Sequence, residues 1–109
     1  MSKGLMDIGV VIVTFNRVEK LKTALLAFDM QSIPPAYVVV VDNASSDETP
    51  VYLSKWENDK KKYMKRVIRM NQNIGGSGGF YTGLQESLKL NAQWIWVSDD
   101  DAFPETDAL

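Results

Sequence analysis

Three segments of the chain are apolar at almost every position. They are residues 8–14, 37–41 and 93–98, and each is rich in β-branched or aromatic side chains. A strand without a polar face is typical of a parallel sheet that is covered on both sides. The segment 66–70 is shorter and more polar, which favours a strand at the edge of the same sheet.

Helical periodicity appears between the first two of these strands. Apolar residues recur there at helical spacing and give one buried face, at Leu21, Ala24, Leu25 and Phe28. Asn16 and Glu19 have the spacing of a capping box at the start of this helix, and Pro34 and Pro35 cannot continue it.

A second helix is expected after the second strand, with Ser45 or Ser46 as its cap. Asp47 and Glu48 would then lie in its first turn, where the helix dipole favours anions, and Pro50 is tolerated there.

A third helix is expected after a glycine-rich loop at residues 73–79, with Phe80, Leu84 and Leu88 on one stripe. Residues 103–105 resemble the start of a further helix, and the sequence stops soon afterwards at Leu109. We therefore expect residues 1–109 to form part of a longer domain.

Strands that alternate with helices predict an α/β fold with a parallel sheet. Right-handed crossover connections place the helices on both faces of that sheet.

Composition narrows the classes of function. The chain has 109 residues, of which 45% are apolar and 24% charged, as in a globular protein. A net charge of −2 gives no electrostatic case for binding nucleic acid, and the short basic cluster at 60–69 fits a solvated connection. The chain lacks a signal-peptide core and any long apolar run, so a cytoplasmic location is the default, with a membrane surface as the alternative.

Polar residues cluster directly after each predicted strand. The clusters are residues 14–17, 42–47, 71–79 and 99–101. In an open parallel sheet, ligands bind beyond the carboxyl ends of the strands. We therefore expect the four clusters to meet at one edge and to form a binding site.

Three consecutive carboxylates, Asp99, Asp100 and Asp101, end the last apolar segment. Like charges this close repel one another, and a divalent cation relieves the repulsion. Because the chain contains no histidine and no cysteine, any metal must be held by oxygen, which favours Mg²⁺ or a similar hard ion. The alternative is a solvated acidic turn.

Single residues of these clusters have plain structural alternatives. Thr14 and Asn16 could only end a strand and cap a helix, and Arg17 could be a surface residue or a cation for a diphosphate. Asp42 could be a turn residue, or it could bind a base or a ribose hydroxyl.

The glycines could permit close approach of a ligand or only close packing of a helix on the sheet. They do not match the dinucleotide fingerprint, because Tyr81 stands where its third glycine is required. They do not match a P-loop, because Leu84 and Gln85 replace its Lys and Ser/Thr.

In order, the segments VIVTFNR (11–17), VVDNASSD (40–47), NIGGSGGF (73–80) and DDD (99–101) resemble the family 2 glycosyltransferases. These are inverting enzymes of the GT-A fold, and the last two segments are most similar to the galactofuranosyltransferase and rhamnosyltransferase branch. The resemblance spans nearly the whole chain but only about the first half of a family catalytic domain.

The resemblance implies a Rossmann-like nucleotide-binding half with strand order 3-2-1-4, which binds a nucleotide-diphospho-sugar such as a UDP- or dTDP-sugar. The residues it assigns to that donor are Thr14, Phe15, Asn16, Arg17, Asp42, Asn43, Ser45, Asn73, Gly76, Asp99 and Asp100.

Within this set, residues 14–17 would contact the base and diphosphate, Asp42 would bind the base with Asn43 and Ser45 nearby, and Asn73 and Gly76 would line the ribose and sugar side. Asp99 and Asp101 would be the acidic positions of a DXD motif and would hold Mg²⁺ or Mn²⁺.

The implied reaction is a single displacement at the anomeric carbon, with inversion, onto a glycan or lipid-linked acceptor in cell-wall polysaccharide synthesis. The catalytic base is expected beyond residue 109, since Glu105 and Asp107 do not match it, so the chain alone should be inactive. Glu48 departs from the glycine that is frequent in the family, with little expected consequence. The resemblance implies a cytoplasmic enzyme, with the inner membrane face as the alternative location.

Two other hypotheses remain from the sequence. One is a nucleotide-binding or interaction module without catalysis of its own, and the weaker one is a receiver-like α/β domain, which expects a late strand and a lysine that are absent here. Half of a GT-A domain would also expose sheet edge and apolar helix faces, so we expect self-association.

Overall fold

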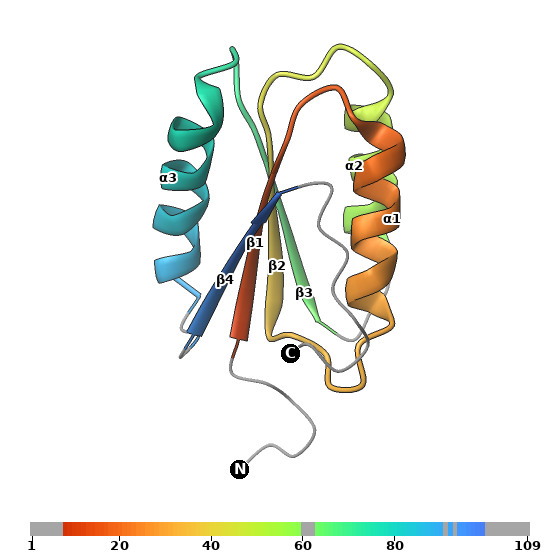
Figure 1. Ribbon diagram of the computed structural model, residues 1–109, viewed down its shortest axis with the longest axis vertical. Helices are drawn as coiled ribbons and strands as arrows, with labels where there is room; N and C mark the ends of the chain where they lie inside the picture. The colour runs from red at the N-terminus through yellow and green to blue at the C-terminus, as the bar shows by residue number, and fades with distance from the viewer. Residues whose placement is uncertain (1–7, 60–62, 91, 93, 100–109) are drawn as a thin grey trace.

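The computed structural model describes residues 8–59, 63–90, 92 and 94–99 of the chain. Along the chain the elements are β1 (Ile8–Thr14), α1 (Val18–Asp29), β2 (Tyr37–Asp42), α2 (Thr49–Asn58), β3 (Met64–Arg69), α3 (Gly75–Leu88) and β4 (Trp94–Asp99). All strand pairs are parallel, and their order in the sheet is β3-β2-β1-β4 (Figure 1). The predicted α/β fold and the predicted order 3-2-1-4 are therefore confirmed.

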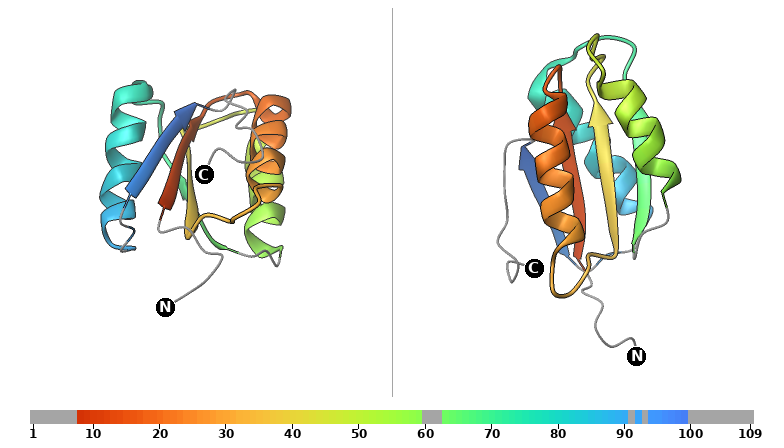
Figure 2. Two further views of the ribbon diagram at one scale, coloured as in Figure 1. Left: turned by 60° about the horizontal axis from the view of Figure 1, so that its bottom comes forward. Right: turned by 90° about the vertical axis from the view of Figure 1, so that its right-hand side faces the viewer.

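The sheet separates two apolar cores. Helices α1 and α2 cover one face and α3 covers the other (Figure 1; Figure 2). The first core joins alternate residues of β1 and β2 to the inward faces of α1 and α2: Val10, Ile12, Val38, Val40, Leu21, Leu25, Phe28, Leu53 and Trp56. The second core contains buried strand residues that face the other way, Val11, Tyr37, Val39 and Val41, with Phe80 of α3 packed against them. This division explains why β1 and β2 are apolar on both faces.

Helix starts differ from the sequence-based expectations. Helix α1 begins at Val18 with Arg17 in the cap position, and no side chain caps it from there, so the predicted capping box of Asn16 and Glu19 is wrong. Helix α2 begins at Thr49, so neither predicted serine caps it, and Asp47 and Glu48 precede its first turn instead of lying in it.

The glycine-rich loop predicted at residues 73–79 is wrong for residues 75–79, which are helical since α3 already begins at Gly75. The predicted stripe is also wrong at Leu88, whose side chain is 74% exposed. Close packing of α3 on the sheet explains why glycine stands at two positions of this helix. A Cβ on Gly79 would come within 2.8 Å of Val13 Cγ1, and one on Gly83 within 2.5 Å of Val11 Cγ1.

Strands β3 and β4 shift by one or two residues from the expected ranges 66–70 and 93–98. The further helix expected at 103–105 lies outside the described residues, as do Asp100 and Asp101.

Candidate nucleotide-binding site

The carboxyl ends of the strands lie at one edge of the sheet, and the loops after β1, β2 and β3 meet there, at the top of Figure 1. Thr14 is in register with Asp42 between β1 and β2, and the backbone of Asp99 is in register with Val13 between β4 and β1. The edge therefore brings together the backbone positions of all four predicted clusters, as far as the structure describes them.

Asp42 is buried at this edge and its carboxylate is fully engaged. It is 1% exposed, and its Oδ1 accepts a hydrogen bond from Ser45 N at 2.9 Å. Its Oδ2 forms an ion pair with Arg69 Nη1 at 2.5 Å, and Arg69 Nη2 donates to Ser45 O at 3.0 Å. The side chain of Arg69 is still 49% exposed, so a guanidinium reaches the surface of the candidate site.

Sequence reasoning missed Arg69. The signal that could have found it is its place at the end of β3, where parallel pairing puts it opposite Asp42. A cation beside a strand-end carboxylate is the expected partner for a buried charge.

Asn16 joins the loop after β1 to the loop after β2. Its Oδ1 accepts hydrogen bonds from Ser46 N at 2.7 Å and Asp47 N at 3.2 Å, and its own backbone N–H donates to Ser45 Oγ at 2.9 Å. Its φ of 52° lies in the left-handed region, which asparagine tolerates better than most residues. Asn16 therefore turns the chain sharply after β1 and connects segments 29 to 31 residues apart.

Asp47 strengthens the same junction. Its Oδ1 accepts a hydrogen bond from Thr49 N at 2.9 Å and its Oδ2 one from Val18 N at 3.3 Å, so one carboxylate serves the first residue of both α2 and α1. Desolvation raises the pKa of Asp47, but the hydrogen bonds from Thr49 and Val18 outweigh it and hold the pKa below its ordinary value of 3.8.

Two further asparagines fix the start of α3. Asn43 is 2% exposed, accepts a hydrogen bond from Ile74 N at 3.0 Å and donates one to Gly75 O at 3.0 Å. Asn73 Oδ1 accepts from Gly75 N at 2.7 Å. Gly75 has a φ of 82°, which its lack of a side chain permits, and the backbone of Gly76 lies in the first turn of α3.

Exposure divides the predicted donor residues into two groups. The buried group contains Thr14, Asp42, Asn43 and Ser45, each at most 2% exposed. The exposed group contains Phe15, Asn16, Arg17 and Asn73. The first group builds the floor of the edge, and the second is exposed to solvent.

Carboxylate oxygens are the donors that suit a metal at this edge. The backbone of Asp99 ends β4 beside β1, and the chain offers neither histidine nor cysteine as a ligand. An oxygen-only donor set fits a hard divalent ion. Within the described residues alone, no three acidic side chains gather closely enough to hold one.

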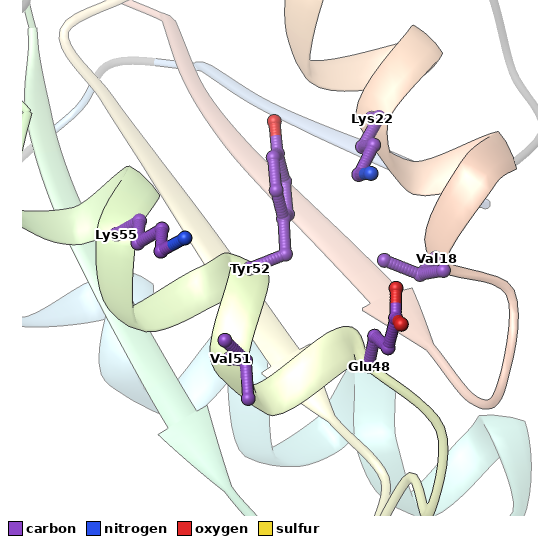
Figure 3. A pocket seen from close by; sticks show the side chains of 6 residues that line it. All are labelled: Val18, Lys22, Glu48, Val51, Tyr52 and Lys55. Atoms are coloured by element: carbon purple, nitrogen blue, oxygen red, sulfur yellow. The ribbon is translucent and has the colours of Figure 1, made fainter.

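A hollow of about 360 Å³ lies between α1 and α2 (Figure 3). Its lining residues are Val18, Lys22, Glu48, Val51, Tyr52 and Lys55. Desolvation and the nearby carboxylates of Asp29 and Asp59 raise the pKa of the Tyr52 hydroxyl. Because the lining includes no strand-end residue, the hollow is separate from the candidate site. A second hollow, of about 330 Å³, is lined by Asn16 and Arg17 together with Val18, Glu19, Lys20 and Asp47.

Among the described residues, no helix is both long enough and apolar enough to cross a membrane.

Comparison with known proteins agrees with this geometry. The model of the family described as "Glycosyl transferase family 2" matches residues 9–109. The chain is 34% identical over 94 residues to the galactofuranosyltransferase GlfT1 of Mycolicibacterium smegmatis, covering 86% of this chain and 30% of that protein. The Mycobacterium tuberculosis GlfT1 is 33% identical over 92 residues, covering 84% of this chain and 29% of that protein. The chain thus spans about 30% of the length of these curated relatives.

Solved structures share the fold. A mannosyltransferase from Pyrobaculum calidifontis, in complex with GDP-Man and Mn²⁺, superimposes with a TM-score of 0.80 at 22% identity, over 92% of this chain and 29% of that one. S. aureus TarS (residues 1–349), in complex with UDP, gives a TM-score of 0.76 at 24% identity, over 94% of this chain and 29% of that one. The match over residues 9–109 shows that the chain belongs to glycosyl transferase family 2.

Proposed function

We propose that residues 1–109 are the donor-binding part of a glycosyltransferase and that the edge at the ends of β1 to β4 binds a nucleotide-diphospho-sugar. The observation that supports this most directly is the junction of the loops after β1 and β2, where Asn16 accepts hydrogen bonds from Ser46 N and Asp47 N. A rigid edge of this kind holds ligand-binding groups in place before the ligand arrives.

Relatives support the class of ligand. The Pyrobaculum mannosyltransferase was solved with GDP-Man and TarS with UDP and with UDP-GlcNAc, all of which contain a nucleoside diphosphate. Together with the similarity to GlfT1, they support a nucleoside-diphosphate sugar as donor. Our proposal for this donor is a UDP- or dTDP-sugar, with transfer to a glycan or lipid-linked acceptor in cell-wall polysaccharide synthesis.

We assign the contacts by exposure. Phe15 is 41% exposed and offers a ring against which a base can stack, and the exposed Arg17 offers a cation to the diphosphate. Asn73 and Gly76 would line the ribose and sugar side, next to Gly75, beside which a Cβ would find open space. Thr14, Asp42, Asn43 and Ser45 would shape the floor below the nucleotide.

A divalent ion, Mg²⁺ or Mn²⁺, would be held by Asp99 and Asp101, with Asp100 also at the nucleotide. When bound, such an ion offsets negative charge on the leaving diphosphate. The Mn²⁺ in the Pyrobaculum enzyme supports this choice of ion.

Transfer itself would need more than this chain. An inverting displacement requires a base that accepts the proton of the acceptor hydroxyl. We expect that base outside residues 1–109, so the chain alone would bind the donor without turnover.

Calorimetric titration of the chain with UDP, with and without Mn²⁺, tests the proposal. We expect saturable binding that the metal strengthens. The absence of binding under both conditions would refute the donor-binding role. Sugar transfer by the chain alone would refute the expectation that the catalytic base lies outside residues 1–109.

A further inference from the structure

We propose that Arg69 is a positioning residue for the edge where the strands end, because its guanidinium holds the loop after β2 in the conformation that binds the donor. This inference rests on the proposed function, since the ligand is the nucleotide of that function. Arg69 lies outside the set of donor residues that the family resemblance assigns. The role that we assign to it requires no contact between Arg69 and the nucleotide.

The guanidinium of Arg69 is not needed to pair the strands. The ladder between β2 and β3 already places Arg69 opposite Asp42, and Met70 N donates to Asp42 O at 2.9 Å. The side chain adds a contact that the ladder cannot supply. Its Nη1 pairs with Asp42 Oδ2 at 2.5 Å, while its Nη2 donates at 3.0 Å to Ser45 O in the loop after β2. Arg69 therefore connects the edge strand β3 to this loop.

Ser45 is the residue at which these contacts converge. It is 2% exposed, its N–H donates to Asp42 Oδ1 at 2.9 Å, and its carbonyl oxygen accepts from Arg69. Its Oγ accepts a hydrogen bond from Asn16 N at 2.9 Å. A shift of Ser45 would therefore move the turn after β1 as well as the loop after β2.

The loop after β2 contains a residue that needs such support. Ala44 has a φ of 68°, in the left-handed region, although alanine has a Cβ and no polar side-chain group that could favour this conformation. A backbone of this kind persists only where the surrounding structure over-determines it. The two acceptors of Arg69, on Asp42 and Ser45, lie on either side of Ala44 in the sequence. We infer that the guanidinium offsets the strain at Ala44.

Arg66 offers a matched control on the same strand. Its Nη1 forms an ion pair with Glu86 Oε2 at 2.6 Å, on the face of the sheet that α3 covers. The side chains of Arg66 and Arg69 are 42% and 49% exposed. Replacement by lysine keeps the charge at either position but substitutes a point charge for the planar guanidinium. Only at position 69 does this weaken a link to the loop after β2.

The experiment uses the isotope-labelled chain. It measures the hydrogen exchange of the Ser46 and Asp47 amides, and the affinity for UDP and for uridine from the shifts of backbone amides. In Arg69→Lys we expect these two amides to exchange roughly tenfold faster, because the loop that contains them opens more often.

Affinity for UDP and for uridine should fall by the same factor in Arg69→Lys. We expect a loss of roughly tenfold, since binding must then order the loop. Arg66→Lys should change the exchange of either amide, or the affinity for either probe, by less than about twofold, as for an exposed ion pair.

Gly83→Ala separates positioning from overall stability. Its new Cβ would crowd Val11 and Val41 on the face that α3 covers, so it should lower the unfolding temperature at least as much as Arg69→Lys does. Because loop amides exchange through local opening, Gly83→Ala should leave the exchange of Ser46 and Asp47 unchanged. It should also leave UDP affinity unchanged.

Several results would overturn the inference while leaving the proposed function intact. They are unchanged exchange or unchanged affinity in Arg69→Lys, and equal changes in Arg66→Lys or Gly83→Ala. A loss confined to UDP would also overturn it, because that result would show direct contact between Arg69 and the diphosphate. A wild-type chain that binds neither UDP nor uridine would overturn the proposed function, and this inference with it.

Discussion

At the residue scale, short polar side chains connect the strand ends to the helices that follow. Asn16, Asn43 and Asp47 each bond to backbone groups from a different segment of the chain, and Asp42 bonds to Ser45 N in the loop that directly follows it. Such partners satisfy N–H groups that would otherwise be left over at helix starts and turns. Hydrogen bonds from side chains to the backbone therefore help to hold the edge of the sheet together.

Asp47 permits a direct test of this description. Asp47→Ala removes the acceptor for both Thr49 N and Val18 N, so we expect the free energy of unfolding at pH 7 to fall by roughly 1 kcal/mol, as for loss of a helix cap. Urea unfolding measures the change. Glu19→Ala is the control, since that carboxylate is 80% exposed and forms only a weak pair with Lys22, and it should change stability by a few tenths of a kcal/mol at most.

The contribution of Asp47 should also depend on pH. Its folded-state pKa is depressed below 3.8, so the stabilisation is fully present above that value and is lost as the pH falls through the folded-state pKa. The difference between wild type and Asp47→Ala should therefore shrink in urea unfolding at pH 3 and below. A difference that stayed constant from pH 7 to pH 2.5 would contradict the assignment.

Several of these residues could be named from the sequence, but their partners could not. Asn16 and Glu19 match a local capping box, yet the oxygen of Asn16 bonds to residues 30 and 31 positions away. Likewise, Asp42 is a recognisable strand-end acid, while its pairing with Arg69 depends on the register of β2 and β3. Local spacing does not contain this tertiary information.

At the scale of elements, the strands were predictable because burial on both faces leaves a continuous apolar run. The start of α3 was not, since glycine favours loops by intrinsic propensity. Here close packing overrides that propensity. Val11 and Val13 approach the helix so closely that only glycine fits at positions 83 and 79.

Gly83→Ala tests this packing. The new Cβ would lie 2.5 Å from Val11 Cγ1 and 3.1 Å from Val41 Cγ2, so we expect a loss of roughly 1–3 kcal/mol in the free energy of unfolding despite the better helix propensity of alanine. Ser77→Ala, at an exposed position of the same helix, should be neutral or slightly stabilising. Chemical denaturation of both variants gives the comparison, and a stabilised Gly83→Ala would show that α3 does not pack this closely.

The two edges of the sheet differ in charge. Strand β3 carries Lys65, Arg66 and Arg69, which discourage pairing with another strand. Strand β4 has no charged residue before Asp99, and Trp94 and Val97 on it are 65% and 44% exposed.

We therefore expect the chain to self-associate through β4, with an apparent mass that rises with concentration in light scattering. Val97→Lys should lower that mass, while Val51→Lys, at an apolar position on α2 that is 62% exposed, should not. A wild-type chain that remained monomeric at all concentrations would disprove the expectation.

At the scale of the whole molecule, the parallel arrangement of the strands places the loops that follow them at the same edge of the sheet. Because every strand runs in the same direction, each loop that follows a strand returns to that edge, and clusters far apart in the sequence become neighbours. This is why the meeting of the four polar clusters at one edge, where we place the candidate site, could be predicted from the strand pattern alone. The sequence did not reveal which polar groups of these residues are hydrogen-bonded within the protein. The structure was needed to identify them.

The central claim is that this edge, and no other surface, meets the nucleotide. Backbone amide chemical shifts of the isotope-labelled chain, recorded during titration with UDP and Mg²⁺, test it most directly. We predict that the perturbed amides cluster at residues 14–17, 42–47 and 69–76. Shifts that instead cluster at the opposite edge, around residues 31–36 and 88–90, or a titration that leaves all amides unmoved, would contradict the account.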